Sequence, residues 1–215
     1  LVMPNQSRTV DYLKFVVKRL YRVIKRTEFL VSEMFPACQV QLPETITFIH
    51  AEEAFERYPQ LAPAEREREL AREYGAIFLI GVGYPLRDHV VHGGRAPDYD
   101  DWSTETINGY HGLNGDIVVW DHVRRDSLEL SSMGIRVDQE TLLRQLEMRN
   151  AVERKDLYWH KRLLNGEFPQ TIGGGIGQSR ICMFLLKKAH IGEVQASIWP
   201  QEFHQEAAEH QVRLL

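Results

Sequence analysis

A run of glycines followed by an arginine stands out as a place where chemistry could occur. Gly173 to Gly175 are consecutive, Gly177 follows, and an apolar segment with a helical pattern begins at once, with Arg180 expected on its first turn. Residues without a Cβ let backbone or a ligand approach closely. A planar, permanently charged guanidinium beside such a floor can stack on a purine and pair with phosphate. The spacing fits neither the dinucleotide fingerprint nor the P-loop, so a turn with a surface arginine is the alternative interpretation.

The segment ELSSMGIR, which begins at Glu129, is a second candidate. If it is a regular strand, Glu129 and Ser131 point to one side of it. Leu130 and Ser132 then point to the other side. A carboxylate at a strand end beside an arginine suits Mg²⁺ held against a nucleotide phosphate. The alternative is that Glu129 forms only a structural ion pair with Arg136.

The segment RAPDYDDW is a third candidate, because it places one arginine and three carboxylates within a short stretch. These side chains are Arg95, Asp98, Asp100 and Asp101. Such a density of negative charge is unfavourable unless cations or an amine-bearing ligand compensate it. The stretch lacks the central glycine of a calcium-binding loop, so it is not predicted to be one. Together, the three candidates suit an enzyme that activates a carboxylate on ATP by alignment and charge neutralisation.

Several helices and strands must position these residues. Apolar residues at helical spacing predict a helix over residues 8–35, and Pro63 with mixed charges at helical spacing predicts one over residues 63–74. Further helices are predicted over residues 51–58, 137–148 and 152–164, the last two rich in charge on one side. Strand-like segments cover residues 44–50, 76–82, 115–120 and 127–131, the last two joined by a hairpin. Residues 83–114 are predicted to be a long, ordered functional loop. Residues 192–199 are expected to be extended, and residues 201–215 to be a tail or a short helix.

Composition narrows the class of protein. The 215 residues carry a net charge of −4 and 43% hydrophobic residues, which indicates one ordinary globular domain and not a general nucleic-acid binder. We find no apolar run long enough to cross a membrane and no secretory signal pattern, so the expected location is cytoplasmic. Cys38 and Cys182 match no metal-ligand spacing and are expected to be buried free thiols.

Five motifs carry a resemblance to a known family. They are RAPDYDDWST at 95–104, GLNGDIVVW at 112–120, ELSSMGIRVD at 129–138, QTIGGGIGQSR at 170–180 and HIGEVQASIWP at 190–200. In this order they closely resemble the ammonia-dependent (A-type) asparagine synthetase, aspartate–ammonia ligase, and the match runs from about residue 44 onward. The resemblance implies an α+β fold like that of class II aminoacyl-tRNA synthetases, with a mainly antiparallel sheet flanked by helices. It also implies a single catalytic domain over residues 1–215 and a homodimer.

The resemblance implies a reaction and a set of site residues. Aspartate and ATP give a β-aspartyl-adenylate and pyrophosphate, and ammonia then displaces AMP to form asparagine. Nucleotide contacts are expected from Arg95, Asp100, Leu130, Ser131, Ser179 and Arg180. Contacts to aspartate are expected from Ser132 and from Arg136, which would pair with the α-carboxylate. Glu129 is expected to hold Mg²⁺, and Asp100, Glu129 and Arg180 are the expected catalytic residues. Either Asp100 or Asp101 is conceivable as the carboxylate that takes a proton from ammonia.

The front of the family pattern is not found in residues 1–43. Missing are the dimer-forming first motif, an aspartate-side carboxylate and lysine, and the second-motif arginine. We therefore expect the chain to be the carboxy-terminal part, roughly two-thirds, of a longer family member, which a first residue of Leu1 supports. A shortened, inactive relative that binds nucleotide or amino acid is the alternative. A tRNA-charging enzyme is disfavoured by the acidic net charge and the lack of an anticodon-binding domain. Neither a nucleic acid nor a membrane is an expected partner.

Overall fold

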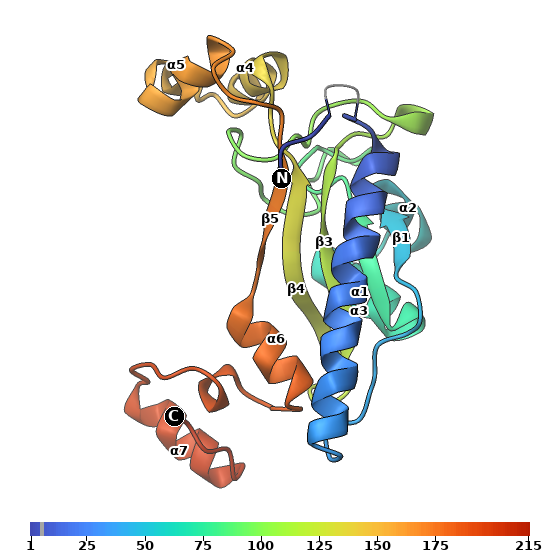
Figure 1. The fold of residues 1–215 in the computed structure, drawn as a ribbon, viewed down its shortest axis with the longest axis vertical. Coiled ribbons are helices and arrows are strands. Elements are labelled where there is room, and N and C mark those ends of the chain that lie inside the picture. The colour runs from blue at the N-terminus through green and yellow to red at the C-terminus, as the bar shows by residue number, and fades with distance from the viewer. Residues whose placement is uncertain (5–6) are drawn as a thin grey trace.

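A mixed five-stranded sheet organises the chain, as seen in the computed structural model, which describes residues 1–4 and 7–215 (Figure 1). Its strands are β1 (Thr47–His50), β2 (Ala76–Ile80), β3 (Asn114–Asp121), β4 (Asp126–Ile135) and β5 (Ile172–Ile176). The spatial order is β1-β2-β3-β4-β5; β1 and β2 are parallel, and the other neighbouring pairs are antiparallel. The predicted α+β class with a mainly antiparallel sheet is confirmed.

One long helix, α1 (Val10–Met34), crosses one face of this sheet (Figure 1). Thr9 caps its amino end by accepting a hydrogen bond from the Tyr12 N–H at 3.1 Å. The buried side chains of α1 recur at helical spacing and include Leu13, Val17 and Tyr21. They pack on apolar residues of β2 to β5 and on α6 (Gln178–Leu185), forming the larger hydrophobic core. The helix predicted over residues 8–35 is confirmed.

Two shorter helices, α2 (Ala51–Arg57) and α3 (Pro63–Tyr74), cover part of the opposite face. Their buried residues pack with Ile77, Leu79 and Val118 in a second core over β1, β2 and the middle of β3. This core does not include residues of β4 or β5. We call the face of β3–β5 that lies opposite α1 the site face.

A third group of helices stands beyond the carboxyl end of β4 (Figure 1). It contains α4 (Gln139–Met148), the 3-10 turn η2 (Val152–Asp156) and α5 (Tyr158–Leu164), which pack around Leu142 and Leu146. The single helix predicted over residues 152–164 is therefore wrong. The backbone is extended at Leu157, which separates η2 from α5.

The glycine run is a strand and not a turn. Gly173 to Gly175 lie within β5 and pair with β4, Gly174 opposite Met133. A Cβ on Gly174 would overlap Met133, so glycine permits the close approach of these two strands. The predicted extended piece at residues 192–199 is wrong in its first part, because the 3-10 turn η3 (Ile191–Glu193) begins there.

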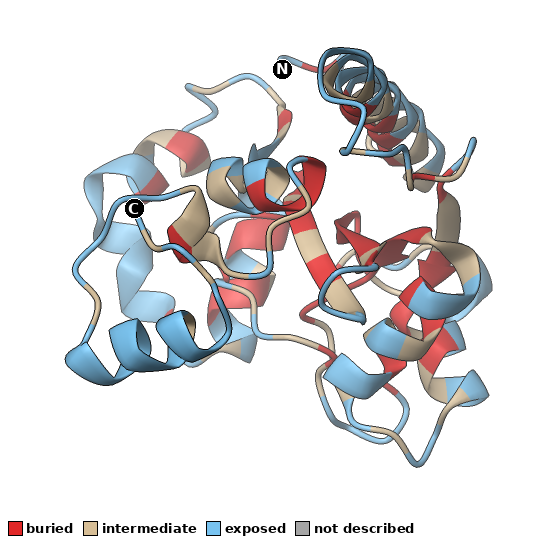
Figure 2. Ribbon diagram, turned by 90° about the horizontal axis from the view of Figure 1, so that it is seen from below, coloured by how far each residue is buried: buried red, intermediate tan, exposed pale blue. Residues whose placement is uncertain are grey.

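The remaining connections largely follow the sequence-based expectations. Residues 83–113 form an irregular loop with isolated β-bridges and a short 3-10 turn, η1 (Ile107–Gly109). The helix α7 (Gln201–Glu209) is the short helix expected near the carboxyl end. Cys38 and Cys182 are free, but Cys38 is half-buried and Cys182 is exposed. They are therefore not the buried thiols that we expected, and α6 buries Met183 and Phe184 instead. The helix beside the carboxyl end, α7, has no buried residue (Figure 2). In the described part of the chain, no helix is both long and apolar enough to cross a membrane.

Candidate functional site

The side chains of β4 do not alternate regularly, because a β-bulge interrupts its pairing with β3. Glu129 and Ser131 pair with successive residues of β3, so Leu130 is an extra residue on β4. The bulge reverses the alternation after it, and Glu129 therefore shares the site face with Ser132. The expectation that Glu129 and Ser131 point to the same side is wrong for this reason.

Leu130 and Ser131 lie on the α1 side of the sheet. Leu130 is 1% exposed in the larger core, and its carbonyl accepts a hydrogen bond from the Gly177 N–H at 2.9 Å. Ser131 lines an apolar groove between the sheet and α1, with Phe15 and Met133 among its neighbours. Its buried hydroxyl has no hydrogen-bond partner within residues 1–4 and 7–215. The side chains of Leu130 and Ser131 therefore lie on the face opposite Glu129 and Ser132, so a contact from either residue to a nucleotide on the site face would come from its backbone.

Arg136 follows β4 directly and forms an ion pair with the buried carboxylate of Asp100. The Tyr99 ring stacks on the guanidinium, with its centroid 3.7 Å from Cζ. Burial raises the pKa of Asp100 to about 6, although Arg136 opposes the shift. Gly134 makes room for this pair, because a Cβ there would lie 2.9 Å from Asp100 Cγ. The guanidinium is thereby oriented before any ligand arrives.

A second ion pair joins Arg95 to Asp116 of β3 on the site face. Arg95 Nη2 also donates a hydrogen bond to Ser132 Oγ at 3.3 Å. Burial raises the pKa of Asp116; the charge of Arg95 opposes the shift and that of Glu129 adds to it. This part of the site, which we call the buried end, consists of Arg95, Asp100, Asp116, Ser132 and Arg136.

Arg8, which precedes α1, holds the buried end in place. It forms ion pairs with Asp101 and Asp138, and its Nη1 donates a hydrogen bond to the Arg136 carbonyl at 2.7 Å. Asp101 is fully buried and also accepts hydrogen bonds from the Thr104 N–H and hydroxyl, at 2.9 and 2.6 Å. The contacts that Asp101 makes with Arg8 and Thr104 hold the loop of residues 83–113 in place, so Asp101 has a structural role.

Glu129 and Arg180 meet at the other end of the site face. Arg180 Nη1 lies 3.4 Å from Glu129 Oε1 and donates a hydrogen bond to the Glu129 carbonyl at 3.2 Å. Both side chains are roughly half exposed. They line a groove of about 400 Å³ together with Arg124 from the turn between β3 and β4. We call Arg124, Glu129 and Arg180 the open end.

Glycines of β5 form the floor between the two ends. A Cβ on Gly173 would lie 3.3 Å from Arg136 Nη2, whereas a Cβ on Gly175 would meet nothing within 4 Å. A Cβ on Gly177, four residues beyond Gly173, would lie 3.2 Å from Arg180 Cδ. Four residues of extended backbone span about 13 Å, so the two ends are separated by roughly the length of an extended small ligand. Arg180 does lie on the first turn of α6, as predicted.

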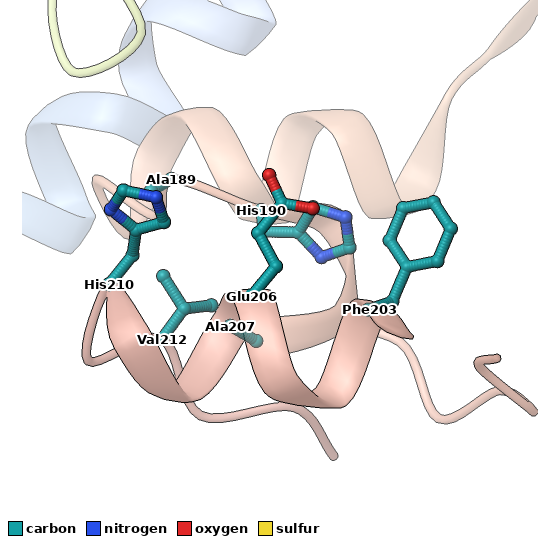
Figure 3. Close-up of a pocket in the computed structure, with 7 residues that line it drawn as sticks. All are labelled: Ala189, His190, Phe203, Glu206, Ala207, His210 and Val212. Atoms are coloured by element: carbon teal, nitrogen blue, oxygen red, sulfur yellow. The ribbon is translucent and has the colours of Figure 1, made fainter. Parts of the chain in front are cut away.

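His190 separates the open end from another groove. That groove, of about 260 Å³, lies between η3 and α7 and is lined by Phe203, Glu206 and His210 (Figure 3). His190 lines both grooves, and its Nδ1 accepts a hydrogen bond from the Gly192 N–H at 3.1 Å. Ser179 is half-buried next to Arg180 on α6.

The described residues contain no group of three or more His, Cys, Asp or Glu side chains placed to hold a metal ion. Glu129 is the exposed carboxylate of the site face, and Asp116 is a buried one on the same face. Asp116 is already paired with Arg95, so Glu129 is the carboxylate that suits Mg²⁺, which is usually held by one or two carboxylates with substrate phosphates and water.

Sequence reasoning missed three residues of the site. Asp116 lies inside the apolar segment GDIVVW, and a charged residue in such a strand was an available signal. Arg8 and Arg124 had no such signal, because their positions depend on long-range packing and on the turn between β3 and β4.

Comparison with known proteins decides the family. The family model for aspartate-ammonia ligase matches residues 1–211. The chain belongs to the aspartate-ammonia ligase family. It is 59% identical over 206 residues to the aspartate–ammonia ligase of Parabacteroides distasonis, covering 96% of this chain and 60% of that protein. The chain therefore spans about three-fifths of the length of this relative.

Solved structures show the same fold at low sequence identity. Asparaginyl-tRNA synthetase of Entamoeba histolytica, in complex with asparaginyl-adenylate, matches with a TM-score of 0.59 and 17% identity, over 91% of this chain and 44% of that one. The Pyrococcus horikoshii asparaginyl-tRNA synthetase, complexed with asparaginyl-adenylate, matches with a TM-score of 0.61 and 19% identity. This match covers 89% of this chain and 46% of that one. The fold of this family member is thus that of class II aminoacyl-tRNA synthetases, as the resemblance implied.

Proposed function

We propose that this protein binds aspartate and ATP and carries out the amidation catalysed by an aspartate–ammonia ligase. Aspartate attacks the α-phosphorus of ATP through its β-carboxylate, the bond to the bridging oxygen breaks, and pyrophosphate leaves. Ammonia then attacks the carbonyl carbon of the β-aspartyl-adenylate and displaces AMP, which yields asparagine. The observation that carries this proposal is the placement of Arg136 and Arg180 at opposite ends of one glycine-floored sheet face.

The buried end suits the amino acid. A guanidinium pairs with a carboxylate through two parallel hydrogen bonds, so Arg136 would bind the α-carboxylate of aspartate. The Tyr99 ring and the Asp100 carboxylate already orient it. Ser132, held by Arg95, offers a hydroxyl on the same face. Burial strengthens each of these interactions because less water competes for them.

The open end suits the nucleotide. Arg180 would stack on the adenine and meet the terminal phosphate, and the absence of a side chain at Gly175 leaves space on the floor beside it. Glu129, paired only loosely with Arg180, would hold Mg²⁺ together with the phosphates of ATP. The ion would neutralise the phosphates when bound. Arg95 and Ser179 remain proposed nucleotide-side residues.

The attack of ammonia requires a proton acceptor. We assign this role to Asp100, because its raised pKa of about 6 leaves it ionised at neutral pH and more basic than an ordinary carboxylate. Asp101 is the weaker choice, since both of its oxygens are paired, with Arg8 and Thr104, whereas the pair with Arg136 uses one oxygen of Asp100.

The comparisons support the ligase over an inactive relative. High identity to a named aspartate–ammonia ligase covers nearly the whole chain. Two structural neighbours hold an adenylate of an amino acid on the same fold, which fits the proposed intermediate. We propose in addition that residues 1–215 act as a single catalytic domain and that the enzyme works as a homodimer.

The test is an assay with aspartate, Mg-ATP and ammonium in which AMP, pyrophosphate and asparagine are all measured. We expect the three products in equal amounts. Formation of ADP in place of AMP, or turnover with glutamine but not with ammonium, would contradict the proposed mechanism.

A further inference from the structure

The groove at the open end contains a cation that the proposed reaction has not yet used. Arg124 lines this groove from the turn between β3 and β4, and Arg180 lines it from α6. Glu129 is the acidic residue among the residues that line the groove. Two guanidinium groups therefore flank one carboxylate, which leaves a positive excess in a groove of about 400 Å³.

The turn fixes the backbone of Arg124 but leaves its side chain weakly held. The Asp121 carboxylate accepts hydrogen bonds from the N–H groups of Val123 and Arg124, at 2.9 and 3.3 Å. The guanidinium of Arg124 lies 4.0 Å from Asp126, at the limit of an ion pair. Asp126 is also 3.6 Å from Arg68. The Arg124 guanidinium can therefore move to an anion without breaking a strong contact.

The neighbouring arginine is placed differently. Arg125 has a left-handed backbone with φ of 54°, and its carbonyl accepts a hydrogen bond from Arg68 at 3.4 Å. It is not among the residues that line the groove. Two adjacent arginines in one turn thus differ in access to the groove, which makes Arg125 a matched control for Arg124.

We propose that Arg124 binds the β- and γ-phosphates of ATP, the part released as pyrophosphate, from the side of the groove opposite Arg180. This inference rests on the proposed function. Negative charge builds up on the pyrophosphate as the bond between the α-phosphorus and the bridging oxygen breaks. A second guanidinium facing that group would stabilise both bound ATP and the departing pyrophosphate.

Calorimetric binding of Mg-ATP, pyrophosphate and AMP to the protein tests this inference. Arg124→Ala should weaken Mg-ATP and pyrophosphate binding about tenfold, the effect of losing one charge-assisted contact at an exposed site. AMP binding should change less than about twofold, because AMP lacks those phosphates. Arg124→Lys should recover part of the loss, and Arg125→Ala should leave all three affinities unchanged.

The outcomes separate this inference from the function on which it rests. If the wild-type protein binds Mg-ATP and Arg124→Ala binds it equally well, Arg124 has no such role. An equal loss of AMP and ATP affinity would also overturn the assignment, since it would place Arg124 near the nucleoside. If the wild-type protein binds no Mg-ATP, the proposed function fails and this inference fails with it. Thermal melting of each variant excludes misfolding as the cause.

Discussion

The two ends of the site face differ in how deeply their charged side chains are buried and how closely these side chains are paired. At the buried end the side chains of Arg136 and Asp100 are 21% and 5% exposed, and those of Arg95 and Asp116 are 21% and 8% exposed. At the open end Arg180 and Glu129 are 45% and 42% exposed, and their closest charged atoms are 3.4 Å apart. One end is therefore organised by the protein itself, whereas the other depends on its ligand for organisation.

This difference follows the chemistry of the proposed ligands. Aspartate is small and has a fixed arrangement of charges, so a rigid pair of guanidinium groups can select it. A triphosphate with Mg²⁺ is flexible and brings its own counter-ion, so exposed and mobile arginines suffice. The pairing at the buried end costs desolvation, which is visible in the raised pKa values of Asp100 and Asp116.

The largest effect is expected at the buried end, from Arg136→Ala. Loss of a bidentate contact to the α-carboxylate should lower kcat/KM for aspartate about a thousandfold, because each charge-assisted hydrogen bond contributes about 1.5–3 kcal/mol. Arg136→Lys keeps the charge but not the planar pair of donors, and it should recover about a hundredfold of the loss. Steady-state kinetics with aspartate as the varied substrate measures this.

The control for that experiment is Arg57→Lys. Arg57 pairs with Glu73 at 2.8 Å between α2 and α3, and its side chain is 44% exposed. It should change kcat/KM less than about twofold. An Arg136→Ala variant that is folded and keeps more than a tenth of wild-type activity would mean that the α-carboxylate binds elsewhere.

The next effect concerns the proton acceptor. Asp100→Asn should lower kcat about a hundredfold, the usual contribution of a general base. In the wild-type protein kcat/KM should rise as the pH increases through about 6, because Asp100 then becomes ionised. The Asn variant should lose this rise. An unchanged pH profile in the variant would assign the proton transfer to another group.

Two neighbouring glycines of β5 have different roles: Gly175 faces the site, whereas Gly174 permits the close packing of β5 on β4. Gly175→Ala places a Cβ in open space, so the fold should remain stable while the KM for ATP rises about tenfold through overlap with the bound nucleotide. Gly174→Ala would overlap Met133 and should instead lower the melting temperature. If Gly175→Ala binds ATP normally, the nucleotide does not lie on this floor.

The smallest effect is a dependence of stability on pH. The folded-state pKa of Asp100 lies above the usual value, so its favourable contribution is complete below about pH 4 and is lost as the pH rises through about 6. The free energy of unfolding should therefore fall by about 2 kcal/mol over this range, relative to Asp100→Asn. Denaturant titrations of both proteins across this range measure the difference. Parallel curves would show that Asp100 is not perturbed by burial.

The sequence was most informative where local pattern determines structure. The regular spacing of Leu13, Val17 and Tyr21 predicted α1, and the apolar run of β2 predicted a buried strand. The family motifs also predicted that Arg136 and Arg180 belong to one site, and both arginines border the glycines of β5 that form the candidate site's floor. The local sequence was enough to predict α1 and β2, because apolar residues recur at helical spacing in α1 and form one continuous run in β2.

The parts that were not predicted depend on pairing between distant segments. The bulge at Leu130 arises from the register with β3. It places Ser131 on the α1 side of the sheet, whereas we expected Ser131 on the same side as Glu129. The glycine run became a strand because β4 supplies its hydrogen bonds. The contact of Arg8 with Asp101 joins residues far apart in the chain, and no local pattern indicates it.

One measurement tests the division of the site most directly: the KM values for aspartate and for ATP in Arg136→Lys and Arg180→Lys. The account predicts a crossed result, in which Arg136→Lys raises the KM for aspartate about tenfold with the KM for ATP within about twofold, and Arg180→Lys does the reverse. Equal shifts of both KM values in each variant would contradict the existence of two separate ends.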